Sequence, residues 1–139
     1  MNNNKIKIII LAAGKGNRMQ NELPKVLIPV GGKPMIERLL KSVEKSGIGD
    51  HPVVVVGYKK EEVMKELGNN YEYAVQEEQL GTGHAIMSTE NLLKGNTDNV
   101  MVLPSDHPFI TEETIKKLAE RHLESGAKIT MATTKLSDF

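Results

Sequence analysis

The stretch KIIILAAGKGNRMQNELPKVL, residues 7–27, carries the clearest indication of the fold. It begins with a continuous, β-branched apolar run at residues 7–11, which is typical of a strand buried on both faces of a parallel sheet. The chain leaves this run through small residues into a loop that contains Lys15, Arg18 and Lys25. Uncovered backbone beside clustered positive charge favours a loop that binds phosphate groups.

Strand and helix patterns alternate along the rest of the chain. Further strands are predicted at residues 53–56, 71–75, 100–103 and 128–133. Helices are predicted from Pro34 to the residue before Gly47, around 63–67, from about 82 to 93, and from Thr111 to the residue before Gly126. This alternation predicts an α/β fold: a doubly wound, mainly parallel, Rossmann-like sheet with helices on both faces. Ligands of such sheets bind beyond the carboxyl ends of the strands, where the loop of residues 12–27 begins.

Length and composition narrow the class of protein. A chain of 139 residues is long enough for one hydrophobic core and short for two. Eighteen basic residues balance eighteen acidic ones, so no overall charge favours nucleic acid or an anionic membrane as a partner. The absence of cysteine favours a reducing compartment, and no apolar run is long enough to span a bilayer. We therefore expect a cytoplasmic domain whose anion site is local.

The glycine-bearing loop has the parts of a phosphate site. Gly14 and Gly16 can adopt positive φ, which lets successive amide N–H groups converge on an anion. Arg18 can form a forked contact with phosphate oxygens, and Lys25, held by the preceding Pro24, supplies a point charge. The loop fits neither the dinucleotide fingerprint nor the Walker loop. On these residues alone, a solvated turn with scattered charges is an equally good interpretation.

Three blocks of sequence carry a family likeness. The stretch LAAGKGNRMQNELPKVL, at residues 11–27, resembles the signature of sugar-1-phosphate nucleotidyltransferases. The stretch QEEQLGTGHA, at 76–85, is similar to the uridine-binding segment of the N-acetylglucosamine-1-phosphate uridylyltransferase branch. The stretch VLPSDHPFI, at 102–110, is similar to the family strand that ends at a metal-binding aspartate. The likeness covers nearly the whole chain and implies a fold of the nucleotide-diphospho-sugar transferase type.

The resemblance also implies roles for individual residues. The nucleotide would be bound by Leu11, Ala12, Ala13, Gly14, Lys15, Gly16, Asn17, Gln76, Gly81 and Thr82. Gln76 would read the uracil edge, since a side-chain amide offers both a donor and an acceptor. Arg18 and Lys25 would be the catalytic cations, and Asp106 would hold Mg²⁺, because a hard divalent ion prefers carboxylate and phosphate oxygens. We expect a structural role for His84, which lies in the same block as Gln76.

The implied reaction joins UTP to a sugar 1-phosphate, with N-acetylglucosamine 1-phosphate as the expected acceptor, and releases pyrophosphate. The attacking phosphate oxygen is already ionised, so the protein has to align two anions and neutralise charge instead of supplying a base. Two alternatives stay open. One is a nucleotide-binding remnant or fragment without turnover. The other is a guanylyl- or cytidylyltransferase relative with a different acceptor.

The chain also departs from the family pattern. Asn17 stands where the family usually has Thr, and Ser105 stands where a Gly usually precedes the metal-binding aspartate. The further strands that hold the sugar in the family, together with a second Mg²⁺ ligand, are not found after residues 128–133. We therefore expect residues 1–139 to form a truncated NTP-binding domain without the C-terminal sugar-binding part. A homo-oligomer or a partner chain is expected to cover its exposed apolar edge.

Overall fold

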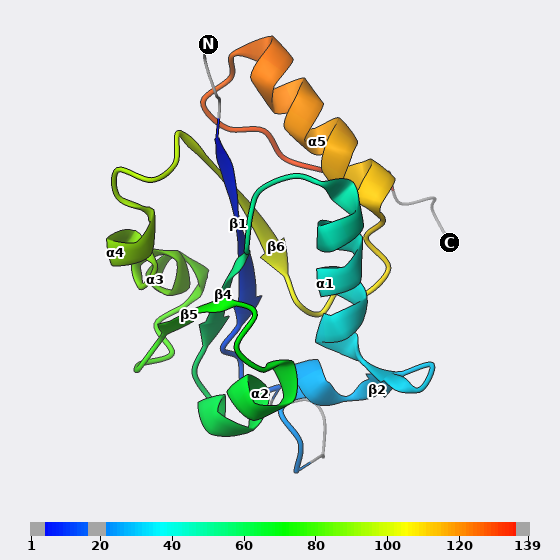
Figure 1. The fold of residues 1–139 in the computed structure, drawn as a ribbon, viewed down its shortest axis with the longest axis vertical. Helices are drawn as coiled ribbons and strands as arrows, with labels where there is room; N and C mark the ends of the chain where they lie inside the picture. The colour runs from blue at the N-terminus through cyan, green and yellow to red at the C-terminus, as the bar shows by residue number, and fades with distance from the viewer. Residues whose placement is uncertain (1–4, 17–21, 136–139) are drawn as a thin grey trace.

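A four-stranded parallel sheet forms the centre of the computed structural model, which describes residues 5–16 and 22–135 (Figure 1). Its strands are β1 (Ile6–Ala12), β4 (Val53–Val56), β5 (Glu72–Val75) and β6 (Asn99–Pro104), in the spatial order β5-β4-β1-β6. Every pairing in this sheet is parallel, and Ile9 lies opposite Val53 on one side and Val102 on the other. The predicted parallel α/β sheet is therefore confirmed, with β1 in the middle.

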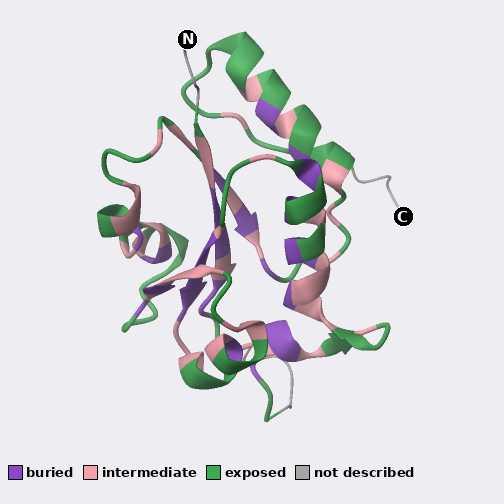
Figure 2. Cartoon of the chain, viewed as in Figure 1, coloured by how far each residue is buried: buried purple, intermediate pink, exposed green. Residues whose placement is uncertain are grey.

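Helices cover both faces of the sheet (Figure 1). Successive side chains of a strand point to opposite faces. Ile8 and Ile10 of β1 accordingly belong to one core cluster and Ile9 to a second. The first cluster includes residues of α1 (Met35–Ser46), α2 (Lys60–Leu67) and α5 (Glu112–Ser125), and the second includes residues of α3 (Thr82–Met87) and α4 (Glu90–Leu93). The buried residues in Figure 2 accordingly concentrate on the strands and on the helix sides that face them. The doubly wound arrangement is confirmed.

Two of the helices begin or end as the sequence predicts. The C-cap of α1 is Gly47 with φ of 64°, and that of α5 is Gly126 with φ of 62°, a left-handed conformation that glycine adopts without strain. Thr111 caps the start of α5, where its hydroxyl oxygen accepts a hydrogen bond from the amide of Thr114. None of the helices in the described ranges has the length and apolarity needed to cross a membrane.

The single helix predicted at about 82–93 is wrong, because the structure divides it into α3 and α4. The break lies at Ser88 and Thr89. The hydroxyl of Ser88 donates to Ala85 O and that of Thr89 donates to Ile86 O, both at 2.6 Å. Short hydroxyl side chains that bond back to the preceding turn compete with the regular helix ladder. Thr89 is completely buried, so the break belongs to the core.

The strand predicted at residues 128–133 is absent from the described part of the chain. The alternation of apolar and polar residues there suits a strand, but a strand also requires a neighbour to complete its ladder. Among the described residues, β6 pairs with β1 alone. The segment is held instead through a side chain, since Thr130 Oγ1 lies 2.9 Å from His122 Nδ1. Ile129 and Met131 are left 79% and 76% exposed.

A small hairpin, not predicted, leads from the first loop into α1. It follows the short 3₁₀ helix η1 (Lys25–Leu27) and pairs β2 (Pro29–Val30) with β3 (Lys33–Pro34). Its two-residue loop is Gly31-Gly32, with φ of 59° and 79°, and positive φ at both central positions is the condition for a type I′ turn. The Arg38 side chain of α1 donates to Val30 O at 2.6 Å and so fixes the hairpin to the helix.

Candidate functional site

The carboxyl edge of the sheet brings together residues that are far apart in the sequence. Because the strands are parallel, the residues that follow them lie at one edge (Figure 1). They are Ala13 after β1, Gly57 after β4, Gln76 after β5 and Ser105 after β6. Such edges are where doubly wound sheets bind their ligands. Three of the four residues stand in or beside the predicted site, so its parts converge.

The first loop offers backbone donors. Within the described residues, the amide N–H groups of Gly14, Lys15 and Gly16 form no hydrogen bond. Gly14 and Lys15 are exposed, whereas Ala12 and Ala13 are buried at the end of β1. Successive unpaired amides at the end of a buried strand suit an anion better than they suit a solvated turn with no ligand.

Of the two loop glycines that can adopt positive φ, Gly16 alone does so. Gly16 has φ of 63°, whereas Gly14 lies outside the left-handed region. A Cβ at Gly16 would lie 2.7 Å from Lys25 Cβ, but one at Gly14 would meet nothing within 4 Å. Gly16 therefore serves both the turn and the close packing of Lys25 against the loop backbone. Gly14 is required neither by a positive φ nor by close packing, and the space next to it is open.

Lys25 and Asp106 meet at the centre of the site. Lys25 Nζ lies 2.9 Å from Asp106 Oδ2, with the two side chains 34% and 40% exposed. The hydrogen bond from the Lys25 ammonium lowers the pKa of the Asp106 carboxyl below its ordinary value, although partial burial opposes this. His107 lies beside the pair, with Nε2 3.6 Å from Asp106 Oδ1. A cation of the first loop is thus joined to the carboxylate after β6.

Asp106 suits a magnesium ion that is shared with a substrate. No cluster of three or more acidic, histidine or cysteine side chains occurs in residues 5–16 and 22–135, so these ranges contain no all-protein metal cage. Mg²⁺ is commonly held by one or two carboxylates while phosphate oxygens and waters complete its coordination. The partly exposed, ionised carboxylate of Asp106, next to a loop that favours phosphate, meets that requirement.

Gln76 is buried, at 4% exposure, and its amide is held in a fixed orientation. Nε2 lies 3.1 Å from Gly81 O and 3.1 Å from His84 Nδ1. Both N–H groups of the amide are therefore engaged by the protein. No hydrogen bond to Gln76 Oε1 is formed by the part of the chain that the structure describes. We predicted that Gln76 could offer a ligand both a donor and an acceptor. In this structure the donor is already used by the protein, so the acceptor Oε1 is the group left for a ligand.

A link between the first loop and the segment around Gln76 was not predicted. Gln79 Nε2 donates to Ala13 O at 2.9 Å, and the Tyr58 amide donates to the same oxygen at 3.2 Å. Gly57 packs closely against the segment of Gln76 and Gln79. A Cβ at Gly57 would lie 2.7 Å from Gln79 Nε2 and 3.0 Å from Gln76 O. In the sequence, this link could have been indicated only by Gln79, the second glutamine of the QEEQ stretch, and by Gly57, the glycine after β4.

The Ser105 side chain is hydrogen-bonded to the end of β1. Its hydroxyl donates to Leu11 O at 2.5 Å, and its amide donates to the same oxygen at 3.2 Å. The residue is buried, at 5% exposure. The extra side chain at this position is therefore used to tie β6 to β1 instead of obstructing the carboxylate.

The remaining predicted residues fall into two groups. Gly81 and Thr82 are exposed and stand at the start of α3, where Gly81 has φ of 99°. Asn17 and Arg18 lie outside the described residues, so their roles stay predictions.

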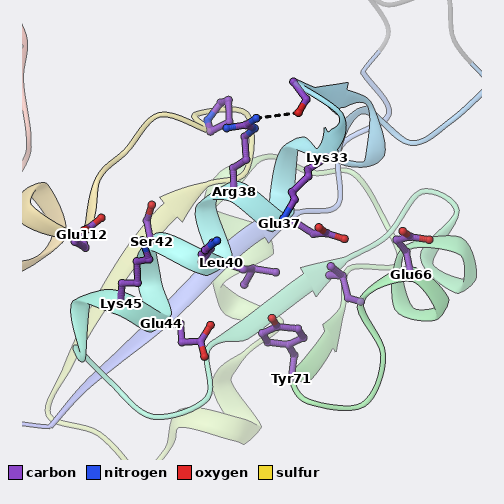
Figure 3. Close-up of a pocket in the computed structure, with 14 residues that line it drawn as sticks. Lys33, Glu37, Arg38, Leu40, Ser42, Glu44, Lys45, Glu66, Tyr71 and Glu112 are labelled. Carbon is purple, nitrogen blue, oxygen red and sulfur yellow. Dashed lines mark hydrogen bonds between the residues drawn. The ribbon is translucent and has the colours of Figure 1, made fainter.

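A hollow of about 620 Å³ lies elsewhere on the molecule, over α1 and beside α2 (Figure 3). Its lining includes none of the predicted site residues. It is lined by both basic and acidic side chains: Lys33, Arg38, Lys41, Lys45, Glu37, Glu44, Glu66 and Glu112. Such a balanced lining favours neither an anion nor a cation, and it does not compete with the carboxyl edge as the site.

Known sequences match nearly the whole chain. The family of MobA-like NTP transferase domains matches residues 8–137. The bifunctional protein GlmU of Exiguobacterium sibiricum is 44% identical over 130 residues, and that of Shouchella clausii is 47% identical over 130 residues. Each match covers 94% of this chain, but 29% and 28% of the two relatives. The chain thus spans less than a third of the length of these curated relatives.

Solved structures agree with the fold. A nucleotidyl transferase from Methanothermobacter thermautotroptrophicus, Mth528, superposes with a TM-score of 0.70 at 24% identity, over 84% of this chain and 57% of the other. HddC from Yersinia pseudotuberculosis, in complex with GMP-PN, superposes with a TM-score of 0.70 at 25% identity, over 85% of this chain and 54% of the other. The likeness to Mth528 concerns the fold alone. The HddC structure was solved with GMP-PN bound.

Proposed function

Since the chain belongs to the family of MobA-like NTP transferase domains, we propose that it transfers a uridylyl group from UTP to a sugar 1-phosphate. N-acetylglucosamine 1-phosphate is the acceptor that we propose, and pyrophosphate is the second product. The absence of cysteine agrees with a reducing compartment, and we place the reaction in the cytoplasm. Residues 1–139 act in this proposal as one NTP-binding domain.

The observation that carries the proposal is the meeting of Lys25 and Asp106 beside loop amides that have no partner among the described residues. Lys25 packs against Gly16 and ends 2.9 Å from Asp106. A phosphate chain that binds the amides of Gly14, Lys15 and Gly16 would therefore lie next to one cation and one ionised carboxylate. Cation, amides and carboxylate are together what a nucleotide with a divalent ion requires.

In the proposed reaction, an oxygen of the sugar phosphate attacks the α-phosphorus of UTP. The new P–O bond forms while the bond to the β-phosphate oxygen breaks, and the electron pair leaves with pyrophosphate. Lys25 exchanges its contact with Asp106 for the phosphate oxygens and stabilises the charge that grows on them. Arg18, by the family resemblance, would hold the β- and γ-phosphates. The nucleophile is already an anion, so no side chain has to remove a proton.

Asp106 is the side chain that would hold Mg²⁺. A bound Mg²⁺ supplies charge neutralisation and alignment for phosphoryl transfer. The task of the protein itself is to keep Asp106 ionised, and the lowered pKa of this carboxyl agrees with that task. Gln76 receives the base: Oε1 of its amide has no partner in the described part of the chain and can accept a hydrogen bond from the ring N–H of uracil.

A guanylyltransferase is the second candidate, because HddC, at 25% identity, was solved with GMP-PN. Guanine also carries a ring N–H, so the acceptor of Gln76 alone does not exclude it. A competition between UTP and GTP for the chain separates the two candidates. UTP that excess GTP does not displace supports the uridylyltransferase, and a chain that binds GTP in preference to UTP supports the guanylyltransferase.

Exposed apolar side chains support association with a second copy or a partner chain. Val100 on β6 is 46% exposed, and Ile129 and Met131 are more exposed still. We propose that a second copy of the chain or a separate partner covers them and supplies contacts to the acceptor sugar. Sedimentation of the purified chain tests this, and a monomer that turns over at full rate would overturn it.

The decisive test of the function is pyrophosphate release from UTP with Mg²⁺ and N-acetylglucosamine 1-phosphate. Asp106→Ala is the negative control, and its folding is checked by circular dichroism. Release that depends on the acceptor and disappears in the control supports the proposal. A chain that binds UTP and releases no pyrophosphate would be a nucleotide-binding module instead of an enzyme.

A further inference from the structure

The orientation of the Gln76 amide is set by two protein groups of different kinds. Gly81 O is a carbonyl oxygen, which can only accept, so the amide must present Nε2 to it. His84 Nδ1 lies at the same distance, 3.1 Å, from the same nitrogen. An amide turned by 180° would place Oε1 against the Gly81 oxygen, and two acceptors would face each other in a buried setting. Only one orientation satisfies the site.

The arrangement also fixes the state of His84. Because Gln76 Nε2 donates, Nδ1 must accept, and a neutral imidazole with Nδ1 as acceptor carries its proton on Nε2. His84 is half-buried and belongs to α3, so the helix determines where its ring stands. Gly81, the other partner of Gln76, immediately precedes that helix. The start of α3 thus holds both N–H groups of one amide.

With both N–H groups engaged, Gln76 presents a single acceptor, Oε1, to a ligand. The hydrogen-bonding edges of the two pyrimidine bases differ at their central atom: N3 of uracil is a donor and N3 of cytosine is an acceptor. An acceptor on the protein matches the first and repels the second. A freely rotating glutamine would match either base, since it could offer its N–H to cytosine.

We infer that His84 is a specificity-determining residue, which positions Gln76 so that the site selects uracil over cytosine. This inference rests on the proposed function, in which Gln76 receives the base. His84 does not touch the base in this arrangement. It acts through Gln76, whose amide it holds with the acceptor outward. Guanine also has a ring N–H donor, so the discrimination concerns pyrimidines, and the exclusion of purines depends on other contacts.

The inference is tested by measuring the affinities of the full chain for UTP and CTP by calorimetry. The wild type, His84→Phe and His84→Asn are compared. Phenylalanine keeps a ring but removes the acceptor, whereas the amide oxygen of asparagine can take the place of Nδ1. We expect His84→Phe to reduce the preference for UTP over CTP by about tenfold, the range of one hydrogen bond, and His84→Asn to restore most of it. Since the triphosphate contacts lie elsewhere, both nucleotides should still bind.

A double substitution separates positioning from a general structural effect. In a Gln76→Ala background, His84→Phe should leave the UTP-to-CTP ratio unchanged, because no amide is left to orient. A further fall in the ratio there would overturn the inference. If His84→Phe does not fold, His84→Ala takes its place, since alanine also removes the acceptor, and an unchanged preference in that variant would contradict the role of an acceptor at position 84.

The failures of the two proposals are distinguishable. A wild-type chain that binds neither nucleotide overturns the proposed function and this inference with it. A wild type that binds UTP and CTP equally, or prefers UTP with a ratio that His84→Phe does not alter, overturns the inference alone. His122→Ala serves as the matched control: its ring contacts Asn99 and Thr130, so the ratio should stay at the wild-type value.

Discussion

Lys25 Nζ lies 2.9 Å from Asp106 Oδ2, although 81 positions separate the two residues in the chain. The contact joins the loop after β1 to the turn after β6, the edge strand that pairs with β1. Without a ligand, each charge neutralises the other. A nucleotide and its metal ion would offer both residues stronger partners, a phosphate for the ammonium and a cation for the carboxylate. In the proposed function, this ion pair is the arrangement that a bound nucleotide and its metal ion would replace.

Replacing Lys25 with Ala should remove most turnover and leave the fold intact. Loss of a group that stabilises transition-state charge commonly lowers kcat by about 10²- to 10³-fold. The ion pair is one-third to two-fifths exposed, so its loss should change the free energy of unfolding by less than about 1 kcal/mol. Steady-state pyrophosphate release and urea unfolding measure the two effects. Lys117→Ala, which removes an exposed pair with Glu113, is the matched control. Near-normal kcat in Lys25→Ala would contradict the role of this lysine.

The ion pair should also give the chain a pH-dependent stability. The folded pKa of Asp106 lies below its ordinary value of 3.8, chiefly because Lys25 donates to it. A carboxyl with a depressed pKa stabilises the fold above its ordinary pKa, and this contribution is lost as the pH falls through the folded value. Wild type should therefore be more stable than Asp106→Asn at about pH 6, and the difference should shrink toward about pH 3. Thermal unfolding across this range measures it.

The same comparison in a Lys25→Ala background is the control for the pH prediction. Without the ammonium, Asp106→Asn should alter stability little at either pH. A pH-dependent difference of the same size in that background would assign the effect to another group.

Replacing Gly16 with Ala should cost stability that the same change at Gly14 does not. Alanine at position 16 would have to adopt φ of 63° and place its Cβ 2.7 Å from Lys25 Cβ. Strain of this kind costs on the order of 1–2 kcal/mol. Gly14 has open space and an ordinary φ, so Gly14→Ala should stay within about 0.5 kcal/mol of wild type. Denaturant unfolding of both variants tests the contrast, and equal losses would contradict it.

The sheet was predictable because the local sequence of each of its buried strands indicates a strand. Val53–Val56 is apolar at every position, and all four side chains are completely buried, as a strand covered on both faces requires. The strand predicted at residues 128–133 failed for the opposite reason. Its alternating pattern is a property of the segment alone, whereas a ladder forms only if the segment lies along the edge of another strand. Among the described residues, 128–133 pair with no strand, although β6 has a free edge. The local pattern therefore did not settle the pairing.

The residues of the candidate site could be named from the sequence, but most of the contacts between them could not. Gln76, Lys25 and Asp106 stood out because their blocks resemble a known family. Nothing local indicated that Gln79 would reach Ala13, since that hydrogen bond joins positions 66 residues apart. The inward turn of Ser105 toward Leu11 was hidden for the same reason, because the contact spans 94 residues. Such contacts depend on the order of the strands, which spacing along the chain does not reveal.

Replacing Gly57 with Ala should disturb the site more than the fold. The new Cβ would lie 2.7 Å from Gln79 Nε2, 3.0 Å from Ala13 Cβ and 3.0 Å from Gln76 O. The end of the Gln79 side chain can move aside, but the other two atoms belong to the first loop and to the segment that would hold the base in the proposed function. We therefore expect the two segments to be pushed apart, with UTP binding weakened by about tenfold and stability lowered by about 1–2 kcal/mol.

Gly83→Ala is the control for this substitution, because it lies inside α3 with no atom within 4 Å of the added Cβ. Gly83 is the second residue of α3, so alanine there should stay within about 0.5 kcal/mol of wild type. Adding Gln79→Ala to Gly57→Ala should recover part of the lost stability by removing the closest contact, but not the UTP affinity, since Ala13 and Gln76 stay displaced. Calorimetric titration with UTP and urea unfolding distinguish these effects. Full recovery of affinity in the double variant would show that Gln79 alone transmits the disturbance, and unchanged affinity in Gly57→Ala would mean that the approach of the two segments is not needed to bind the nucleotide.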